Sequence, residues 1–304
     1  MKHSPRLAAT FLVLLSGAAA AADLVPDRPH VCDPCDYWSK PREPFRVFGN
    51  TWFVGGNLSA ILITSDKGHV LLDGGLPQSA PSIAANIKKL GFHLEDVKLI
   101  LNSHMHYDHA GGIAALQRAS GAQVAASSAG KRALERGGPL EDDPQFAFGP
   151  EHNNFPAVAD VREVKDGETL KAGGIEITAH YTPGHTPGGT SWTWRSCEAG
   201  RCLDMVYADS LNSVSAPGFR FSGDEQHASR VPQFERSIAT VAALQCDVLL
   251  APHPELIDLD GKLEVLGKQG AKNPFIGDRQ DCKRYADGAR DRLTKRVAEE
   301  KATK

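Results

Sequence analysis

The strongest constraint on the fold is a dense cluster of polar side chains directly after a short apolar segment. Residues 97–101 are apolar but for one lysine and predict a short buried strand, and residues 103–109 then read Ser-His-Met-His-Tyr-Asp-His before Ala-Gly-Gly. Burying several imidazoles and a carboxylate together is costly unless a cation compensates them. Zinc binds imidazole and carboxylate ligands, and His-x-His spacing turns both rings the same way. We therefore expect a metal site at a strand-to-helix turn, in preference to a turn of solvated histidines.

Two more histidines follow apolar segments elsewhere in the chain. His185 lies in Thr-Pro-Gly-His-Thr-Pro-Gly-Gly after residues 175–181, and His253 ends Val-Leu-Leu-Ala-Pro-His. Either one alone is ordinarily a capping or core histidine. With the first cluster they complete a set of ligands that is sufficient for two zinc ions with open coordination positions: His104, His106, Asp108, His109, His185 and His253.

The rest of the chain predicts two halves of similar design. The first half predicts strands at 45–54, 58–64, 70–72, 97–101 and 123–126, with helices at 79–90 and 111–118. The second half predicts strands at 161–164, 175–182, 191–194, 205–208 and 247–251, a helix at 231–244 and a long C-terminal helix. Hairpin strands followed by βα units in each half predict an α/β layered sandwich. The irregular stretch 137–154 predicts a loop over the site.

The N-terminus has the pattern of an export signal. Lys2 and Arg6 precede an apolar run over residues 7–15, and small residues at 17–22 offer a cleavage point after Ala20 or Ala22. An uncleaved anchor is the alternative, but the apolar run is too short to span a membrane. We expect residues 1–22 to be a signal peptide, and residues 23–304 to form a single domain in the periplasm.

The cysteines and the net charge limit the functional classes. Six cysteines in an exported chain predict disulfides. Cys197 and Cys202 could join a hairpin, and Cys246 and Cys282 could tie a strand to the C-terminal helix. The remaining two cysteines, in the sequence Cys32-Asp-Pro-Cys35, predict a structural disulfide, with a redox motif as the alternative. A net charge of −3 gives no indication of a nucleic-acid surface.

These histidine motifs resemble the signature of the metallo-β-lactamase superfamily. Asp73, in Leu-Asp-Gly-Gly, matches the first motif of that superfamily. Tyr-Ala-Asp-Ser at 207–210, followed by Ser-Ala-Pro-Gly-Phe at 215–219, resembles the third subclass of class B β-lactamases. The resemblance extends over residues 45–282.

The resemblance implies a four-layer αββα fold and a specific division of the ligands. One zinc ion would bind His104, His106 and His185. The second zinc ion would bind Asp108, His109 and His253.

The resemblance also implies residues that bind substrate or support the metal ligands. Ser210 stands where other subclasses have a cysteine ligand, and it would contact the substrate carboxylate. Asn212, Ser213 and Ser215 compete as a second contact with the substrate. In thioesterase relatives an aspartate of this region bridges the metals, but the register favours Asp209 outside the ligand set. Asp73 would support a ligand histidine.

The activity that follows from the resemblance is zinc-dependent hydrolysis of the β-lactam amide bond of penicillins, cephalosporins and carbapenems, which confers antibiotic resistance. A zinc-bridging hydroxide would attack the carbonyl, and Asp108 would orient it. The chain has no Ser-x-x-Lys motif with a partner set. The alternatives are a lactonase or thioesterase on the same di-zinc scaffold, and a zinc-binding or storage protein. We expect a monomer with a small-molecule substrate and no membrane association after signal cleavage.

Overall fold

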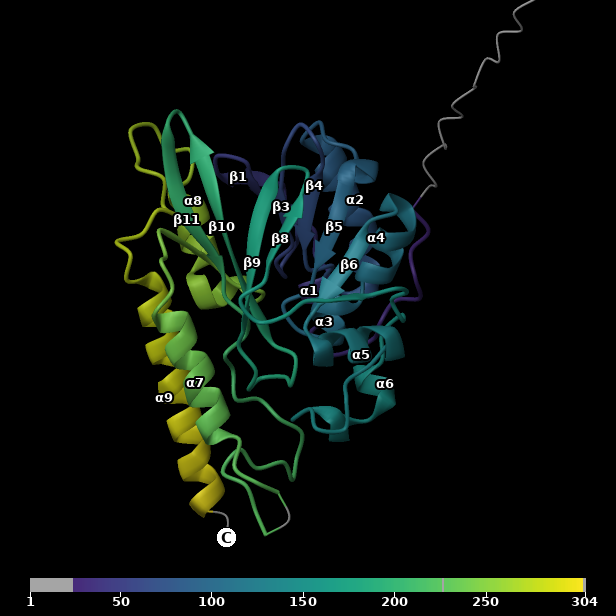
Figure 1. Cartoon of the computed structure of the whole chain (residues 1–304), viewed down its shortest axis with the longest axis vertical. Helices are drawn as coiled ribbons and strands as arrows, with labels where there is room; N and C mark the ends of the chain where they lie inside the picture. The colour runs from purple at the N-terminus through teal and green to yellow at the C-terminus, as the bar shows by residue number, and fades with distance from the viewer. Residues whose placement is uncertain (1–23, 226, 303–304) are drawn as a thin grey trace, which may run out of the picture.

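The strands of this computed structural model, which describes residues 24–225 and 227–302, form two sheets that lie face to face (Figure 1). Within those residues the first sheet has seven strands in chain order, antiparallel from β1 to β4 and parallel from β4 to β7. These are β1 (Phe45–Phe48), β2 (Thr51–Phe53), β3 (Ile61–Ile63), β4 (His69–Leu72), β5 (Val97–Leu101), β6 (Gln123–Ala126) and β7 (Arg162–Glu163).

The second sheet has the order β12-β11-β10-β9-β8 and is antiparallel except for the parallel pair β11 and β12. Its strands are β8 (Thr169–Ala172), β9 (Ile175–Tyr181), β10 (Thr190–Glu198), β11 (Arg201–Tyr207) and β12 (Val248–Leu250).

Side chains of the first sheet alternate between two apolar cores. Ile61 and Ile63 of β3 join the core between the sheets, where Trp192 and Trp194 of β10 also pack. Leu62, between the two isoleucines, joins the core under the helices of the first sheet. Because both faces of these strands are buried, their sequence is apolar throughout instead of alternating with polar residues.

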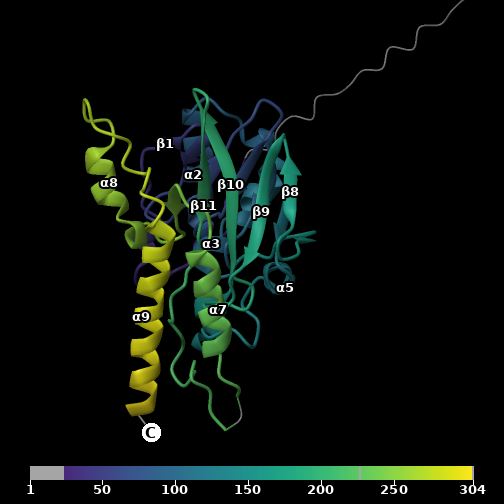
Figure 2. The same cartoon turned by 60° about the vertical axis from the view of Figure 1, so that its left-hand side comes forward.

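Helices cover the outer face of each sheet, as the two views show (Figures 1 and 2). α2 (Ala80–Lys89), α4 (Ile113–Ser120) and α5 (Ser128–Arg136) pack on the first sheet through residues such as Ile83 and Leu116. α7 (Val231–Ala242) and α9 (Asp281–Ala302) lie side by side at the second sheet. The predicted αββα sandwich is confirmed.

Several predicted boundaries shift by one or two residues. The helix predicted at 79–90 is α2, which follows a 3₁₀ turn, η1 (Pro77–Ser79). The structure adds β8 and α5, which the sequence did not predict. The stretch predicted as irregular contains η3 (Phe146–Phe148) and α6 (Pro150–Asn153). The other short elements are α1 (Cys35–Trp38), η2 (Leu94–Asp96), α3 (Tyr107–Ala110), η4 (Pro254–Ile257) and α8 (Leu259–Val265).

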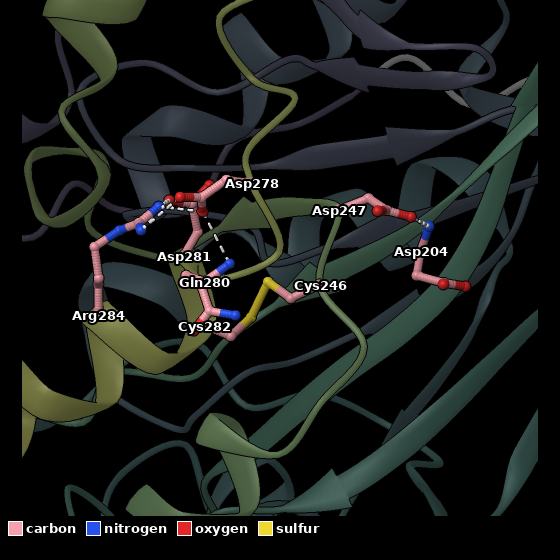
Figure 3. Close-up of a disulfide and its surroundings, with 8 residues drawn as sticks. All are labelled: Asp204, Cys246, Asp247, Asp278, Gln280, Asp281, Cys282 and Arg284. Atoms are coloured by element: carbon pink, nitrogen blue, oxygen red, sulfur yellow. Dashed lines mark hydrogen bonds and ion pairs between the residues drawn. A yellow bond between two sulfur atoms is a disulfide. The ribbon is translucent and has the colours of Figure 1, made fainter.

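All three expected disulfides are present: Cys32–Cys35, Cys197–Cys202 and Cys246–Cys282. Figure 3 shows the last of them, which joins the chain just before β12 to the start of α9. The predicted signal peptide, residues 1–22, lies outside the described residues. None of the helices among the described residues is long and apolar enough to cross a membrane.

Candidate metal centre

The predicted ligands come from turns that follow strands of both sheets. His104 and His106 lie in the turn after β5, and Asp108 and His109 lie in α3 directly beyond it. His185 follows β9 and His253 follows β12. The last residues of β5 and β12 are apolar and buried, so they fix the positions from which these two polar turns begin.

The structure brings all six predicted ligands together. Single ligand atoms from His104, His106 and His185 lie within 4.8 Å of one another, as do those of His104, Asp108 and His109. His253 joins the second group, because its Nε2 lies 3.2 Å from Nε2 of His109 and 3.5 Å from Oδ2 of Asp108. The side chain of His253 is 18% exposed, whereas the other five residues are buried.

In the first group, each ring has an oxygen atom on the nitrogen that faces away from the centre. Nδ1 of His104 lies 3.0 Å from Oδ1 of Asp209, and Nε2 of His106 lies 3.2 Å from Oδ1 of Asp143. Nδ1 of His185 lies 2.7 Å from the backbone oxygen of Asn212. The nitrogens left for a metal are therefore Nε2 of His104, Nδ1 of His106 and Nε2 of His185. Nε2 of His104 is buried without a hydrogen-bond partner, as expected for a ligand atom.

The second group is less fully paired, because Nδ1 of His109 is buried without a hydrogen-bond partner within the described residues. Oδ2 of Asp108 lies 3.0 Å from Nε2 of His109. Nδ1 of His253, the ring nitrogen that faces away from the other ligands, lies 3.3 Å from Oε1 of Glu255. Two imidazole nitrogens and a carboxylate oxygen thus converge on one point, and this donor set suits zinc.

Burial and neighbouring charges keep several ligands in the ionisation state that binds metal. Burial lowers the pKa of His185 to about 3, with a further contribution from His106. Burial also holds the pKa of His104 well below its ordinary value. Burial alone would raise the pKa of Asp108, but His109 and His253 outweigh it, and the net pKa is lowered. Neutral imidazoles and an ionised carboxylate are the forms that coordinate a metal ion.

Two buried aspartates lie beside the ligand histidines. Asp73 accepts hydrogen bonds from the backbone and hydroxyl of Ser103, from the amide of Asn102 and from the hydroxyl of Tyr207. Its Oδ2 also lies 4.0 Å from Nδ1 of His109.

Asp209 is fully buried against His104. Gly189 leaves the space for it, since a Cβ at that position would lie 2.2 Å from Oδ2 of Asp209. Asp209 therefore contacts a ligand histidine from outside the cluster, the arrangement that the register of the motif favoured.

A cavity of about 290 Å³ opens at the centre. Ser210 and Asn212 line it, as the sequence predicts for substrate contacts, whereas Ser215 does not. The hydroxyl of Ser215 instead accepts a hydrogen bond of 2.6 Å from Arg296. The other residues that line the cavity are Trp38, His106, Tyr107, Asp108, Gln145, His185, Val214, His253, Glu255 and Leu256.

Three of the groups that face ligand histidines were not predicted: the side chains of Asp143 and Glu255 and the backbone oxygen of Asn212. Asp143 lies in a stretch without periodicity, and Glu255 lies within the short 3₁₀ helix η4, so neither carried a signal. Asn212 contributes a backbone oxygen, which no residue pattern can indicate.

The chain is similar in sequence and structure to known proteins. The family model described as the metallo-beta-lactamase superfamily matches residues 54–231. The crystal structure of MEM-A1, a subclass B3 metallo-beta-lactamase isolated from a soil metagenome library, is 52% identical, with a TM-score of 0.83 over 88% of this chain and 100% of that chain. The Rm3 metallo-beta-lactamase is 50% identical, with a TM-score of 0.85 over 89% and 99% of the two chains.

A more distant match is the hydroxyacylglutathione hydrolase of Rhodopseudomonas palustris (strain HaA2), which is 34% identical over 138 residues. The match covers 45% of this chain and 42% of that protein, less than half the length of this curated relative. The family match covers more than half of the chain, and the solved relatives match nearly all of it. The chain belongs to the metallo-β-lactamase superfamily, and MEM-A1, to which it is 52% identical, is a subclass B3 enzyme.

Proposed function

We infer that this protein is a zinc-dependent β-lactamase that hydrolyses the amide bond of penicillins, cephalosporins and carbapenems. The observation that carries this inference is the convergence of six ligands at the base of a cavity that Ser210 and Asn212 also line. The chain is about half identical to solved metallo-β-lactamases over nearly their whole length, which supports the same substrate class.

We propose that the centre holds two zinc ions. His104, His106 and His185 would hold one ion, and Asp108, His109 and His253 would hold the other. Bound zinc lowers the pKa of water and polarises a carbonyl oxygen.

The residues around the ions would bind and orient the reactants. The carboxylate of Asp108 can accept a hydrogen bond from the attacking water while it holds its ion. Ser210 and Asn212 can donate hydrogen bonds to the carboxylate of the substrate, and Oγ of Ser210 has no partner within the described residues. Since Ser215 is bound by Arg296, we propose Ser210 and Asn212 as the substrate contacts in this region.

We further propose that residues 23–304 form one catalytic domain, exported to the periplasm by residues 1–22. There it would act as a monomer on small-molecule antibiotics and confer resistance to them. Fractionation and size-exclusion chromatography of the native protein would test these two points.

Turnover of a chromogenic cephalosporin by the purified protein tests the activity. We expect hydrolysis that a chelator abolishes and that added zinc restores, with two zinc ions per chain by elemental analysis. A serine-acylating inhibitor should leave no covalent adduct detectable by mass spectrometry. Much faster turnover of a lactone or a thioester than of any β-lactam would overturn the proposal in favour of the related activities.

A further inference from the structure

A buried carboxylate outside the ligand set contacts His106. Asp143 lies between α5 and α6, and its side chain is fully buried. Its Oδ1 lies 3.2 Å from Nε2 of His106 and accepts a hydrogen bond of 2.8 Å from the backbone amide of Gln145. Its Oδ2 has no hydrogen-bond partner within the described residues. Burying a carboxylate with so few hydrogen-bond partners costs free energy, and the packing of the loop alone does not require it.

The contact determines which nitrogen of His106 faces the metal. A hydrogen on Nε2 can donate to Asp143, and Nδ1 is then free to coordinate.

The same residue holds one wall of the cavity. Gln145, whose amide donates to Asp143, lines the cavity next to His106. The neighbouring Pro144 accepts a hydrogen bond of 2.9 Å from the amide of Ala216, and Asn153 donates one of 2.8 Å to the backbone oxygen of Gln145. Residues 142–149 are therefore tied together around Asp143, between a metal ligand and the substrate cavity.

We propose that Asp143 is a positioning residue that couples zinc binding at His106 to the placement of residues 142–149 over the cavity. When the segment is docked, Asp143 orients the ring for the metal. By reciprocity, zinc must favour the docked segment by the same free energy. The inference rests on the proposed function only in that the centre binds zinc, and its test needs no β-lactam.

The test compares Asp143→Ala and Asp143→Asn with the control Asp142→Ala. Asp142 is in the same segment and has the same charge, but its side chain is 49% exposed and lies 3.8 Å from Arg230. Zinc affinity is measured by competition with a chromophoric chelator. We expect Asp143→Ala to weaken affinity about 10–100-fold, which is typical of lost support for a ligand histidine. Asp143→Asn should recover part of it, because the amide oxygen still accepts from Nε2, and Asp142→Ala should bind zinc like the natural protein.

Hydrogen exchange with and without zinc provides a second measurement. If Asp143 had a merely structural role, its removal would not change how zinc affects this exchange. Zinc should slow exchange of the Gln145 and Ala216 amides in the natural protein and in Asp142→Ala. In Asp143→Ala zinc should no longer affect them.

Three outcomes would overturn the proposal: unchanged zinc affinity in Asp143→Ala, an equal loss in Asp142→Ala, or zinc-dependent protection that persists without Asp143. If Asp143→Ala does not fold, the isosteric Asp143→Asn provides the same comparison. Failure of the natural protein to bind zinc would instead contradict the proposed function.

Discussion

The ligand histidines are oriented by protein groups on their outward nitrogens. Asp209, Asp143 and Glu255 face His104, His106 and His253, and a backbone oxygen faces His185. The contacts of His106 with Asp143 and of His185 with Asn212 are hydrogen bonds, which select a tautomer and leave the other ring nitrogen for the metal. Protein groups therefore help to set the ring orientations at this site.

Asp108→Asn should lower kcat/KM for a cephalosporin by about a hundredfold or more. Neutralising Asp108 weakens the hold on one ion and the orientation of water, and a loss of ~3 kcal/mol corresponds to about a hundredfold in rate. The matched control is Asp142→Asn, which removes a carboxylate charge that is 49% exposed and lies 3.8 Å from Arg230, and which should have a much smaller effect. Equal rates in Asp108→Asn and the natural protein would contradict the role of Asp108.

Ser210→Ala should raise KM and leave bound zinc unchanged. It removes one hydrogen bond to the substrate, worth about 0.5–1.5 kcal/mol, or up to ~3 kcal/mol with a charged partner, so the effect is a few-fold to about a hundredfold. Ser215→Ala is the control, because its hydroxyl is bound by Arg296 away from the cavity. A loss of zinc in Ser210→Ala would show that Ser210 supports the metal instead.

Asp73→Ala should destabilise the protein by about 3 kcal/mol or more. The substitution leaves the hydrogen-bond donors of Asn102, Ser103 and Tyr207 buried without their acceptor. Tyr207→Phe removes only one of these donors and keeps the apolar volume, so it should cost about 1.5–3 kcal/mol. Urea unfolding of the metal-free proteins measures both, and equal stability of Asp73→Ala and the natural protein would contradict this account.

At the scale of elements, the strands fix where the turns with the ligands begin, and disulfides secure the connections between elements. Cys197–Cys202 joins two residues that face each other across the hairpin of β10 and β11. Cys246–Cys282 instead joins α9 to the chain just before β12 (Figure 3). Next to it, Asp247 accepts hydrogen bonds from the amide of Asp204 and the side chain of Arg279. The Cys246–Cys282 disulfide therefore lies where three separate segments meet.

Removing Cys246–Cys282 by a double serine substitution should destabilise the protein more than removing Cys197–Cys202. The sequence separations are 36 and 5 residues, so the chain-entropy model gives losses of about 4 and about 2 kcal/mol. Urea unfolding of both double variants measures the difference. A larger loss for the short loop would show that strain or local packing outweighs chain entropy here.

At the scale of the whole molecule, the metal centre joins the two halves of the sandwich. His104 and His106 follow a strand of the first sheet, whereas His185 and His253 follow strands of the second sheet. A metal ion held by ligands from both sheets cannot bind once the sheets separate, so its binding free energy adds to the stability of the folded state.

Zinc should therefore raise the melting temperature of the metal-free protein. At a free zinc concentration a thousandfold above Kd, linkage gives about 4 kcal/mol. Calorimetry over a series of zinc concentrations measures the shift. A variant that keeps the fold but lacks His185 should show a much smaller shift, and an unchanged Tm in the natural protein would indicate that zinc does not bridge the sheets.

The sequence by itself was sufficient to predict the metal ligands and the strands that lead to them. β5 and β6 have the predicted bounds because apolar runs of strand length end at polar turns. The six ligands were recognisable because metal chemistry requires particular side chains at close spacing, and such a pattern is local in the chain. The disulfide partners followed from cysteines placed near the ends of predicted elements.

The tertiary structure was needed for the residues that orient those ligands. Asp143 contacts a histidine 37 residues away, and the backbone oxygen of Asn212 contacts one 27 residues away. Ser215 matched the motif, but its hydroxyl accepts a hydrogen bond from Arg296, 81 residues further along the chain. None of these contacts has a periodicity or spacing rule, because each depends on how segments far apart in the chain pack against one another. A single carboxylate or carbonyl acquires such a role only when the fold buries it beside its partner.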